Sequence, residues 1–228
     1  MKLSTSMTHR ETLLGWSYLL VSMFVLPMVF ELINSLLGHP LSEAVVNVLY
    51  FLVNFLCVAV IFRRFLLLSV KTALGKPWRC LGFAVLGLIL YHLTMTLISQ
   101  IIVRLYPEFS NVNDDAIMDM AEESYALIAF ATIWLVPIAE ETFYRGLFFQ
   151  GLQRKNRLLA YCLSTLVFAG IHVIGYIGRY HWLTLLLCYI QYLPAGIVLA
   201  WAYEKTDTIV TPIFMHITIN QIGMSAMR

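Results

Sequence analysis

Six ionisable or amide side chains in the second half of the chain interrupt long apolar runs. They are Glu140, Glu141, Arg145, His172, His216 and Asn220. A carboxylate and an imidazole can take a proton from water, while N–H groups of imidazoles and amides can stabilise an oxyanion. Ionisable groups in apolar sequence are costly, and they mark functional sites when the sequence spans a membrane. Together these residues predict acid–base chemistry in a pocket shielded from lipid.

The first motif contains two adjacent carboxylates, and only one of them is expected to have an ion-pair partner. Glu141 and Arg145 are four residues apart with the acid first, which is the favourable order for a helical ion pair. Glu140 is rotated by about 100° from Glu141 on a helix and is expected to lack that partner. Pro137 cannot donate a backbone hydrogen bond and is expected to bend the helix just before the motif.

The three motifs lie at similar depth in their helices. Measured from the ends of the expected helices, Glu140 lies roughly 18 Å in, His172 roughly 21 Å and His216 roughly 12 Å. His216 and Asn220 share one helical face because they are four residues apart. Each residue alone could be a packing or ion-pair residue, as we expect for His92. All of them at one depth predict a shared site.

The elements that carry these motifs are membrane helices. Of the 228 residues 60% are hydrophobic, 12% are charged and the formal net charge is +2. Such composition argues against a soluble fold, a disordered chain or a nucleic-acid-binding protein. The expected fold is all-α, a polytopic transmembrane bundle of about seven to eight spans, forming one integral-membrane domain over residues 1–228. Residues 1–124 would be N-terminal spans and residues 125–228 would carry the motifs.

Seven apolar stretches are long enough to cross a bilayer. They run Leu13–Leu37, Leu41–Phe62, Cys80–Val103, Tyr125–Leu152, Leu158–Ile177, Trp182–Tyr203 and Thr208–Met224. An extra interfacial or re-entrant helix is open at Phe65–Leu74. The first stretch lacks the features of a cleaved signal peptide and is expected to be a retained anchor. The polar segment Arg104–Ser124 predicts either a mobile outer loop or a short surface helix.

The charges between the spans alternate with the expected crossings. Lys and Arg gather in the N-terminal tail and in the second and fourth loops, whereas the third loop is acidic. By the positive-inside rule the N-terminus is cytoplasmic and the C-terminus lies outside. Cys57, Cys80, Cys162 and Cys188 all lie in apolar sequence, and no two of them form a CxxC pair; we expect them to be buried small hydrophobes.

Three motifs in this order resemble those of the CPBP intramembrane proteases, also called the Abi or type II CAAX prenyl protease family. They are Glu140-Glu141-x-x-x-Arg145, Phe168-x-x-x-His172 and His216-x-x-x-Asn220. The resemblance covers about Trp134 to Asn220, while residues 1–124 match only as hydrophobic spans. It implies hydrolysis of a peptide bond within the membrane, in a CAAX-like protein or a peptide precursor.

The resemblance also implies a role for each motif residue. Glu140 would activate water with help from His172, and His216 with Asn220 would stabilise the oxyanion. Glu141 with Arg145 would either hold the site in shape or orient His172. Glu140, His172 and His216 are also a donor set that suits zinc, so one Zn²⁺ and no metal both stay open.

Two other functions also stay open. Buried Glu, Arg and His occur in ion-coupled transporters, although no repeated half with a matching broken helix is found here. A non-catalytic scaffold, such as a bacteriocin self-immunity protein, is the third. The expected partners are the lipid bilayer and a membrane-bound peptide or protein substrate, and no nucleic acid is expected. The short loops favour a location in a prokaryotic cytoplasmic membrane. The sequence does not identify the substrate or the oligomeric state.

Overall fold

A computed structural model describes residues 5–226, and every regular element in that range is a helix. The all-α membrane fold is therefore confirmed. Six continuous helices are long and apolar enough to cross a membrane, namely His9–Leu36, Glu43–Ile61, Pro77–Leu105, Val112–Gln153, Arg157–Ile174 and Trp182–Thr206. The chain is a multi-pass membrane protein.

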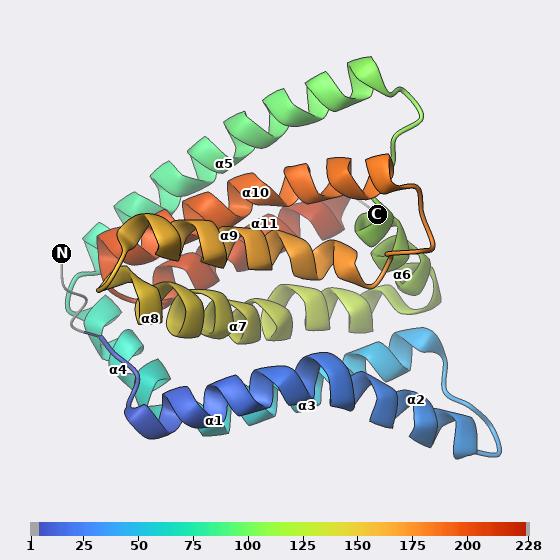
Figure 1. Cartoon of the computed structure of the whole chain (residues 1–228), viewed down its shortest axis with the longest axis horizontal. Helices are drawn as coiled ribbons and strands as arrows, with labels where there is room; N and C mark the ends of the chain where they lie inside the picture. Colours follow the sequence, from blue (N-terminus) through green and yellow to red (C-terminus); the bar gives the residue numbers. More distant parts are fainter. Residues whose placement is uncertain (1–4, 227–228) are drawn as a thin grey trace.

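Two further helices complete the described part of the chain. The last expected span is α11 (Val210–Ala226), whose 17 residues reach about 25 Å, slightly less than the hydrocarbon core. The extra helix is α4 (Arg63–Leu74), which is too short to cross a bilayer. It lies at the N-terminal end of the bundle (Figure 1). Its first turn is capped from another helix, because Glu11 Oε1 accepts the Phe65 N–H at 2.9 Å.

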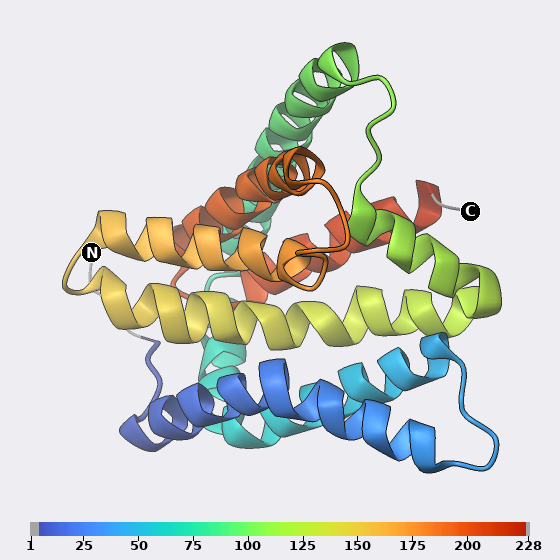
Figure 2. The same cartoon turned by 45° about the vertical axis from the view of Figure 1, so that its right-hand side comes forward.

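The crossings form layers around the fourth one (Figures 1 and 2). On one side lie α1 (His9–Leu20), α2 (Leu26–Leu36) and α3 (Glu43–Ile61). On the other side lie α9 (Arg157–Ile174), α10 (Trp182–Thr206), α11 and, outermost, α5 (Pro77–Leu105). The most apolar stretch of the fourth crossing is 50% buried, compared with 11% for each of the first three. The motif with the carboxylates therefore lies on the central helix.

The fourth crossing is irregular around that motif. It comprises α6 (Val112–Phe130), the π-helical turn η2 (Ala131–Leu135), α7 (Val136–Glu141), a second π-helical segment η3 (Thr142–Phe149) and α8 (Gln150–Gln153). Pro137 lies in the first turn of α7, directly after η2. The backbone is kinked at Ser124, so the first part of α6 is the short helix that was one of two expectations for the outer polar segment.

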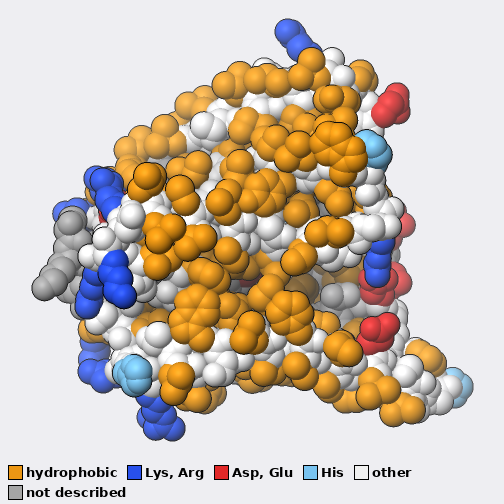
Figure 3. Space-filling view, in the orientation of Figure 1, with side chains coloured by type: hydrophobic (Ala, Val, Ile, Leu, Met, Phe, Trp, Pro, Cys, Tyr) orange, Lys and Arg blue, Asp and Glu red, His pale blue; other side chains and the backbone are white. Residues whose placement is uncertain are grey.

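Charge divides the molecule into two ends. Figure 3 shows most of the visible Lys and Arg side chains at one end, the Asp and Glu side chains at the other, and an apolar belt between them. The two termini lie at opposite ends of the bundle (Figure 1). This arrangement requires an odd number of crossings, as the seven expected spans do. We refer below to the basic end and the acidic end.

Candidate active site

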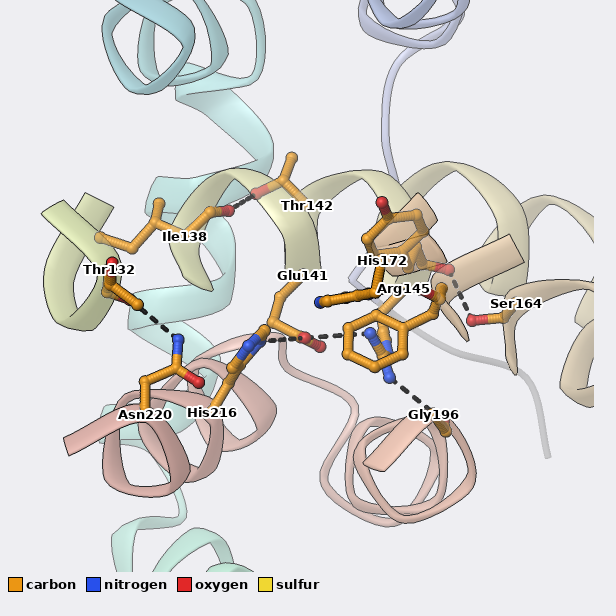
Figure 4. Close-up of polar contacts among 12 residues, drawn as sticks. Thr132, Ile138, Glu141, Thr142, Arg145, Ser164, His172, Gly196, His216 and Asn220 are labelled. Atoms are coloured by element: carbon orange, nitrogen blue, oxygen red, sulfur yellow. Dashed lines mark hydrogen bonds and ion pairs between the residues drawn. The ribbon is translucent and has the colours of Figure 1, made fainter. Parts of the chain in front are cut away.

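Glu141 is the centre of a buried polar cluster on the fourth crossing. Its side chain is fully buried, and Oε1 accepts hydrogen bonds from Arg145 NH1 at 2.9 Å and from His216 Nδ1 at 2.9 Å. Figure 4 shows this chain of contacts. The ion pair expected from the four-residue spacing is thus confirmed. The imidazole bonded to Glu141 belongs to His216, however, and not to His172 as one expectation had it.

Arg145 ties the motif to the neighbouring helices. Its side chain is fully buried, and NH2 donates to the Gly196 carbonyl of α10 at 3.1 Å. Its guanidinium carbon lies 4.8 Å from the centre of the Phe168 ring, which belongs to α9. A charge-assisted hydrogen bond and a cation–π contact both favour the ionised guanidinium away from water. Arg145 therefore compensates the buried Glu141 carboxylate and fixes three helices relative to one another.

The Phe168 ring brings the two imidazoles together. Its centre lies 4.8 Å from that of the His172 ring and 5.8 Å from that of the His216 ring. His172 Nδ1 lies 2.7 Å from the Phe168 carbonyl. A carbonyl only accepts hydrogen bonds, so Nδ1 carries the proton and Nε2 keeps a lone pair. On the other side His172 stacks on Tyr192, with ring centres 4.1 Å apart.

Asn220 is held by the irregular backbone of the fourth crossing. In the turn η2 the Val136 N–H bonds to the Ala131 carbonyl, five residues back rather than four. In that register the Thr132 carbonyl would be paired with residue 137, which is proline and has no N–H. Asn220 Nδ2 donates to this carbonyl at 2.8 Å (Figure 4). The proline and the π-helical turn thus create the acceptor that positions the amide.

Glu140 has quite different surroundings from its neighbour. Among the residues that the structure describes it has no hydrogen-bond or ion-pair partner, and its Oε2 is buried. Glu141 Oε2 is also buried without a partner, but the other oxygen of Glu141 accepts two hydrogen bonds. The Glu140 side chain lines a cavity of about 140 Å³ between the fourth crossing and the N-terminal helices. We call this space the Glu140 cavity.

Three polar residues of the N-terminal half line the Glu140 cavity, and the sequence motifs did not identify them. They are Ser22, Tyr50 and Asn54. Asn54 Oδ1 is buried without a partner in the described part of the chain, whereas Tyr50 donates to the Ser22 carbonyl at 3.1 Å. The one feature of the sequence that could have pointed to Asn54 is that it is a polar residue inside an apolar span. Nothing in the sequence related it to the later motifs, because its neighbours in space lie about 85 residues further on.

The expected zinc donors are not gathered for metal binding. Within residues 5–226 no three His, Cys, Asp or Glu side chains form a group that could hold a metal ion, so Glu140, His172 and His216 do not form such a set. His216 Nδ1 bonds to Glu141, and the Glu140 side chain lines the Glu140 cavity. No step below uses a metal ion.

The chemistry available to the polar cluster depends on its atoms that have no hydrogen-bond partner. Nδ1 of His216 bonds to Glu141 and Nδ1 of His172 to the Phe168 carbonyl, so Nε2 of each imidazole has no hydrogen-bond partner among the described residues. Glu140 Oε2 likewise has no partner there and is available to a proton. A base, an imidazole lone pair and an amide are the parts that hydrolysis of an acyl bond requires.

Comparison with known proteins gives matches for part of the chain. The model of the family "Type II CAAX prenyl endopeptidase Rce1-like" matches residues 122–222. The chain is also 22% identical over 148 residues to the UPF0177 protein YxdF of Lactococcus lactis, a match that covers 64% of this chain and 77% of that protein. No solved structure matches the chain. The matched segment holds all three motifs, so this part of the chain is similar to the type II CAAX prenyl endopeptidases.

Proposed function

We propose that this protein is an intramembrane endopeptidase that hydrolyses a peptide bond in a membrane-associated peptide or protein. We place it in a prokaryotic cytoplasmic membrane and treat residues 1–228 as one domain. The Rce1-like match supports a fold of the CAAX type of intramembrane protease. The observation that carries the proposal is the contrast between the two adjacent carboxylates. Glu141 is bonded to Arg145 and His216, whereas Glu140 has no partner and faces a cavity.

Glu140 is the general base in this mechanism. A carboxylate without an ion-pair partner, in a space that can hold water, can accept a proton from that water as the oxygen attacks the scissile carbonyl. The same carboxyl group then returns the proton to the leaving amine, so that the base is regenerated. His172 assists by accepting a hydrogen bond from the water at Nε2, because its Nδ1 proton is held by the Phe168 carbonyl.

His216 and Asn220 stabilise the oxyanion of the tetrahedral intermediate. His216 Nδ1 donates to the Glu141 carboxylate, and a proton on Nε2 is then directed away from that carboxylate and can be donated to the oxyanion. Asn220 uses one amide hydrogen for the Thr132 carbonyl and keeps the other. Glu141 and Arg145 act by positioning His216, not by touching the substrate. Asn54 supplies a further amide to the Glu140 cavity, where it can bind the water or the peptide backbone.

Replacement of each acid by Gln separates catalysis from architecture. We expect Glu140→Gln to abolish cleavage and to keep the melting temperature, because that carboxylate bonds to no described residue. Glu141→Gln is the matched control in the adjacent position. It should lower the free energy of unfolding by about 3–5 kcal/mol, since the Arg145 charge loses its buried counter-ion.

The measurements use purified protein in detergent and in proteoliposomes. Thermal denaturation gives stability, and mass spectrometry of a pool of single-span and lipid-modified reporter peptides gives cleavage. Equal stability of the two variants would contradict the pairing of Glu141. Cleavage by Glu140→Gln at the parental rate, or no cleavage of any reporter by the parent protein, would favour a transporter or an immunity scaffold instead.

A further inference from the structure

A second, much larger cavity lies at the acidic end of the molecule. It has a volume of about 1110 Å³ and is walled by the adjoining ends of α2 and α3, the start of α6 and the segment after α9. We call it the outer cleft. Its polar side chains are Glu31, Asn34, Glu43, Asn47, Asn113 and Arg179. A volume of this size exceeds that of most small-molecule pockets and is sufficient for an extended peptide segment.

The outer cleft adjoins the Glu140 cavity. Tyr50 of α3 and Ile171 of α9 line both spaces, so they form the boundary between them. Ile171 also directly precedes His172 in the sequence. The boundary between the outer cleft and the Glu140 cavity thus includes these two side chains.

The cavity that the described residues form at the basic end has no such connection to the Glu140 cavity. A cavity of about 510 Å³ lies there and is lined by residues that include Arg10, Leu14, Arg63 and Arg64. It shares no lining residue with the Glu140 cavity.

Charge in the outer cleft favours one kind of substrate. Glu31 and Glu43 are exposed on the wall formed by α2 and α3, and Arg179 is exposed on the facing wall. None of the three forms an ion pair within residues 5–226. Two carboxylates and one guanidinium leave a net negative charge, which attracts a cationic group. The neighbouring Asp114 and Asp115 add negative charge at the same end.

We propose that the substrate is a peptide segment with a cationic side chain that enters from the acidic end through the outer cleft and passes Tyr50 and Ile171 to reach Glu140. This inference rests on the proposed endopeptidase function and defines its substrate class. With the N-terminus in the cytoplasm, the acidic end faces outward. A peptide exposed at the outer face then fits the cleft better than a cytoplasmic prenylated C-terminus does.

Cysteine labelling tests the route without any need for catalysis. Ser22→Cys places a thiol of nearly the same size in the Glu140 cavity, and Leu14→Cys places one in the cavity of the basic end. Both are made in the full chain and compared with the parent protein, which has four cysteines of its own. The probes are membrane-impermeant methanethiosulfonates, one carrying a trimethylammonium group and one a sulfonate, added to intact cells and to opened membranes.

We expect the Ser22→Cys thiol to react in intact cells and the Leu14→Cys thiol to react only in opened membranes. Relative to a free thiol, the cationic reagent should react at Ser22→Cys roughly four-fold faster than the anionic one, since each charge about 10 Å away changes the rate about two-fold in water. Glu31→Gln with Glu43→Gln should reduce this preference, with Glu140 still present in the cavity, and Ile171→Trp should slow both reagents by narrowing the boundary.

The outcomes separate this inference from the proposed function. Reaction of Ser22→Cys only in opened membranes would overturn entry from the acidic end, even if the protein cleaves peptides. An unchanged reagent preference after removal of both carboxylates would overturn the cationic substrate. Labelling as expected in a protein that cleaves no reporter would keep the route and reject the endopeptidase. Melting temperatures of the variants confirm that each is folded.

Discussion

Glu140 and Glu141 are adjacent in one helical turn, but their side chains have different surroundings. Glu141 points into the layer of α9–α11, where Arg145 and His216 bond to it, and Glu140 points toward the N-terminal helices. Their rotation of about 100° on the helix is enough to place them on different faces. A buried carboxylate with a counter-ion helps to hold the helices in place. A carboxylate that faces a cavity and has no partner can gain and lose a proton during a reaction.

His216 and His172 bond to different kinds of acceptor, so their alanine variants should differ in stability. His216→Ala removes a hydrogen bond to the fully buried Glu141 carboxylate and should lower stability by about 1–3 kcal/mol. His172→Ala removes ring contacts and a bond to a carbonyl of its own helix, but it takes no partner from a buried charge and should have a smaller effect. Both should abolish cleavage. His92→Ala, in another span, serves as the control that keeps it. Retained cleavage in both test variants would remove the proposed site.

Asn54 tests whether the N-terminal half contributes to the reaction. Its Oδ1 is buried without a partner in the described part of the chain, so Asn54→Leu should keep or raise the melting temperature. Cleavage should fall at least about ten-fold, equivalent to roughly 1.4 kcal/mol of transition-state stabilisation. Asn54→Gln, which retains the amide, should recover part of the rate. A loss of stability without loss of cleavage would show that Asn54 has a packing role only.

At the scale of the elements, irregular backbone and close helix packing position the side chains. The π-helical turn η2 and Pro137 expose the carbonyl that Asn220 binds. π-Helical turns are rare and occur preferentially at functional sites. A second positioning feature is the close contact of α9 with α10 at Gly196. The Gly196 carbonyl accepts the hydrogen bond from Arg145. Small residues allow such close approach between membrane helices.

Gly196→Ala should disturb this contact. An added Cβ would lie 2.8 Å from Thr165 Cγ2 and 3.0 Å from Thr165 Cα, so the two backbones must separate. We expect a loss of about 1–3 kcal/mol of stability and slower cleavage, because Arg145 shifts with α10. The control is Gly82→Ala on α5, where a Cβ meets no atom within 4 Å. That change should be neutral or stabilising by up to about 1 kcal/mol. Equal melting temperatures would contradict the tight contact.

At the scale of the whole molecule, the segregation of charge defines the orientation. The basic end, where the N-terminus lies, is expected to face the cytoplasm, and the acidic end with the outer cleft is expected to face outward. The central fourth crossing then presents Glu140 between the N-terminal layer and the layer of α9–α11. Each layer contributes walls to the cavity, so we expect that residues 125–228 without the N-terminal spans would be inactive.

Reporter fusions test this orientation. A reporter enzyme that is active only outside the cytoplasm should be active when fused after Arg228 and inactive when fused before Met1. The physical reason is that seven crossings place the two termini on opposite sides. A fusion in the first loop, after His39, serves as the outer control. Activity of both terminal fusions, or of neither, would show an even number of crossings and would require a different orientation of the outer cleft.

Local patterns in the sequence determined the helical membrane fold, the segregation of charge and the pair of Glu141 with Arg145. Apolar run length and a spacing of four residues depend only on the helix itself. The tertiary structure alone decided that His216 bonds to Glu141, that the Phe168 ring lies between two imidazoles and that Asn54 faces Glu140. Within residues 5–226 it showed no group of three His, Cys, Asp or Glu side chains that could hold a metal ion. Such contacts depend on how helices far apart in the sequence are rotated and packed against one another, and that geometry has no signature in the spacing of residues along one helix.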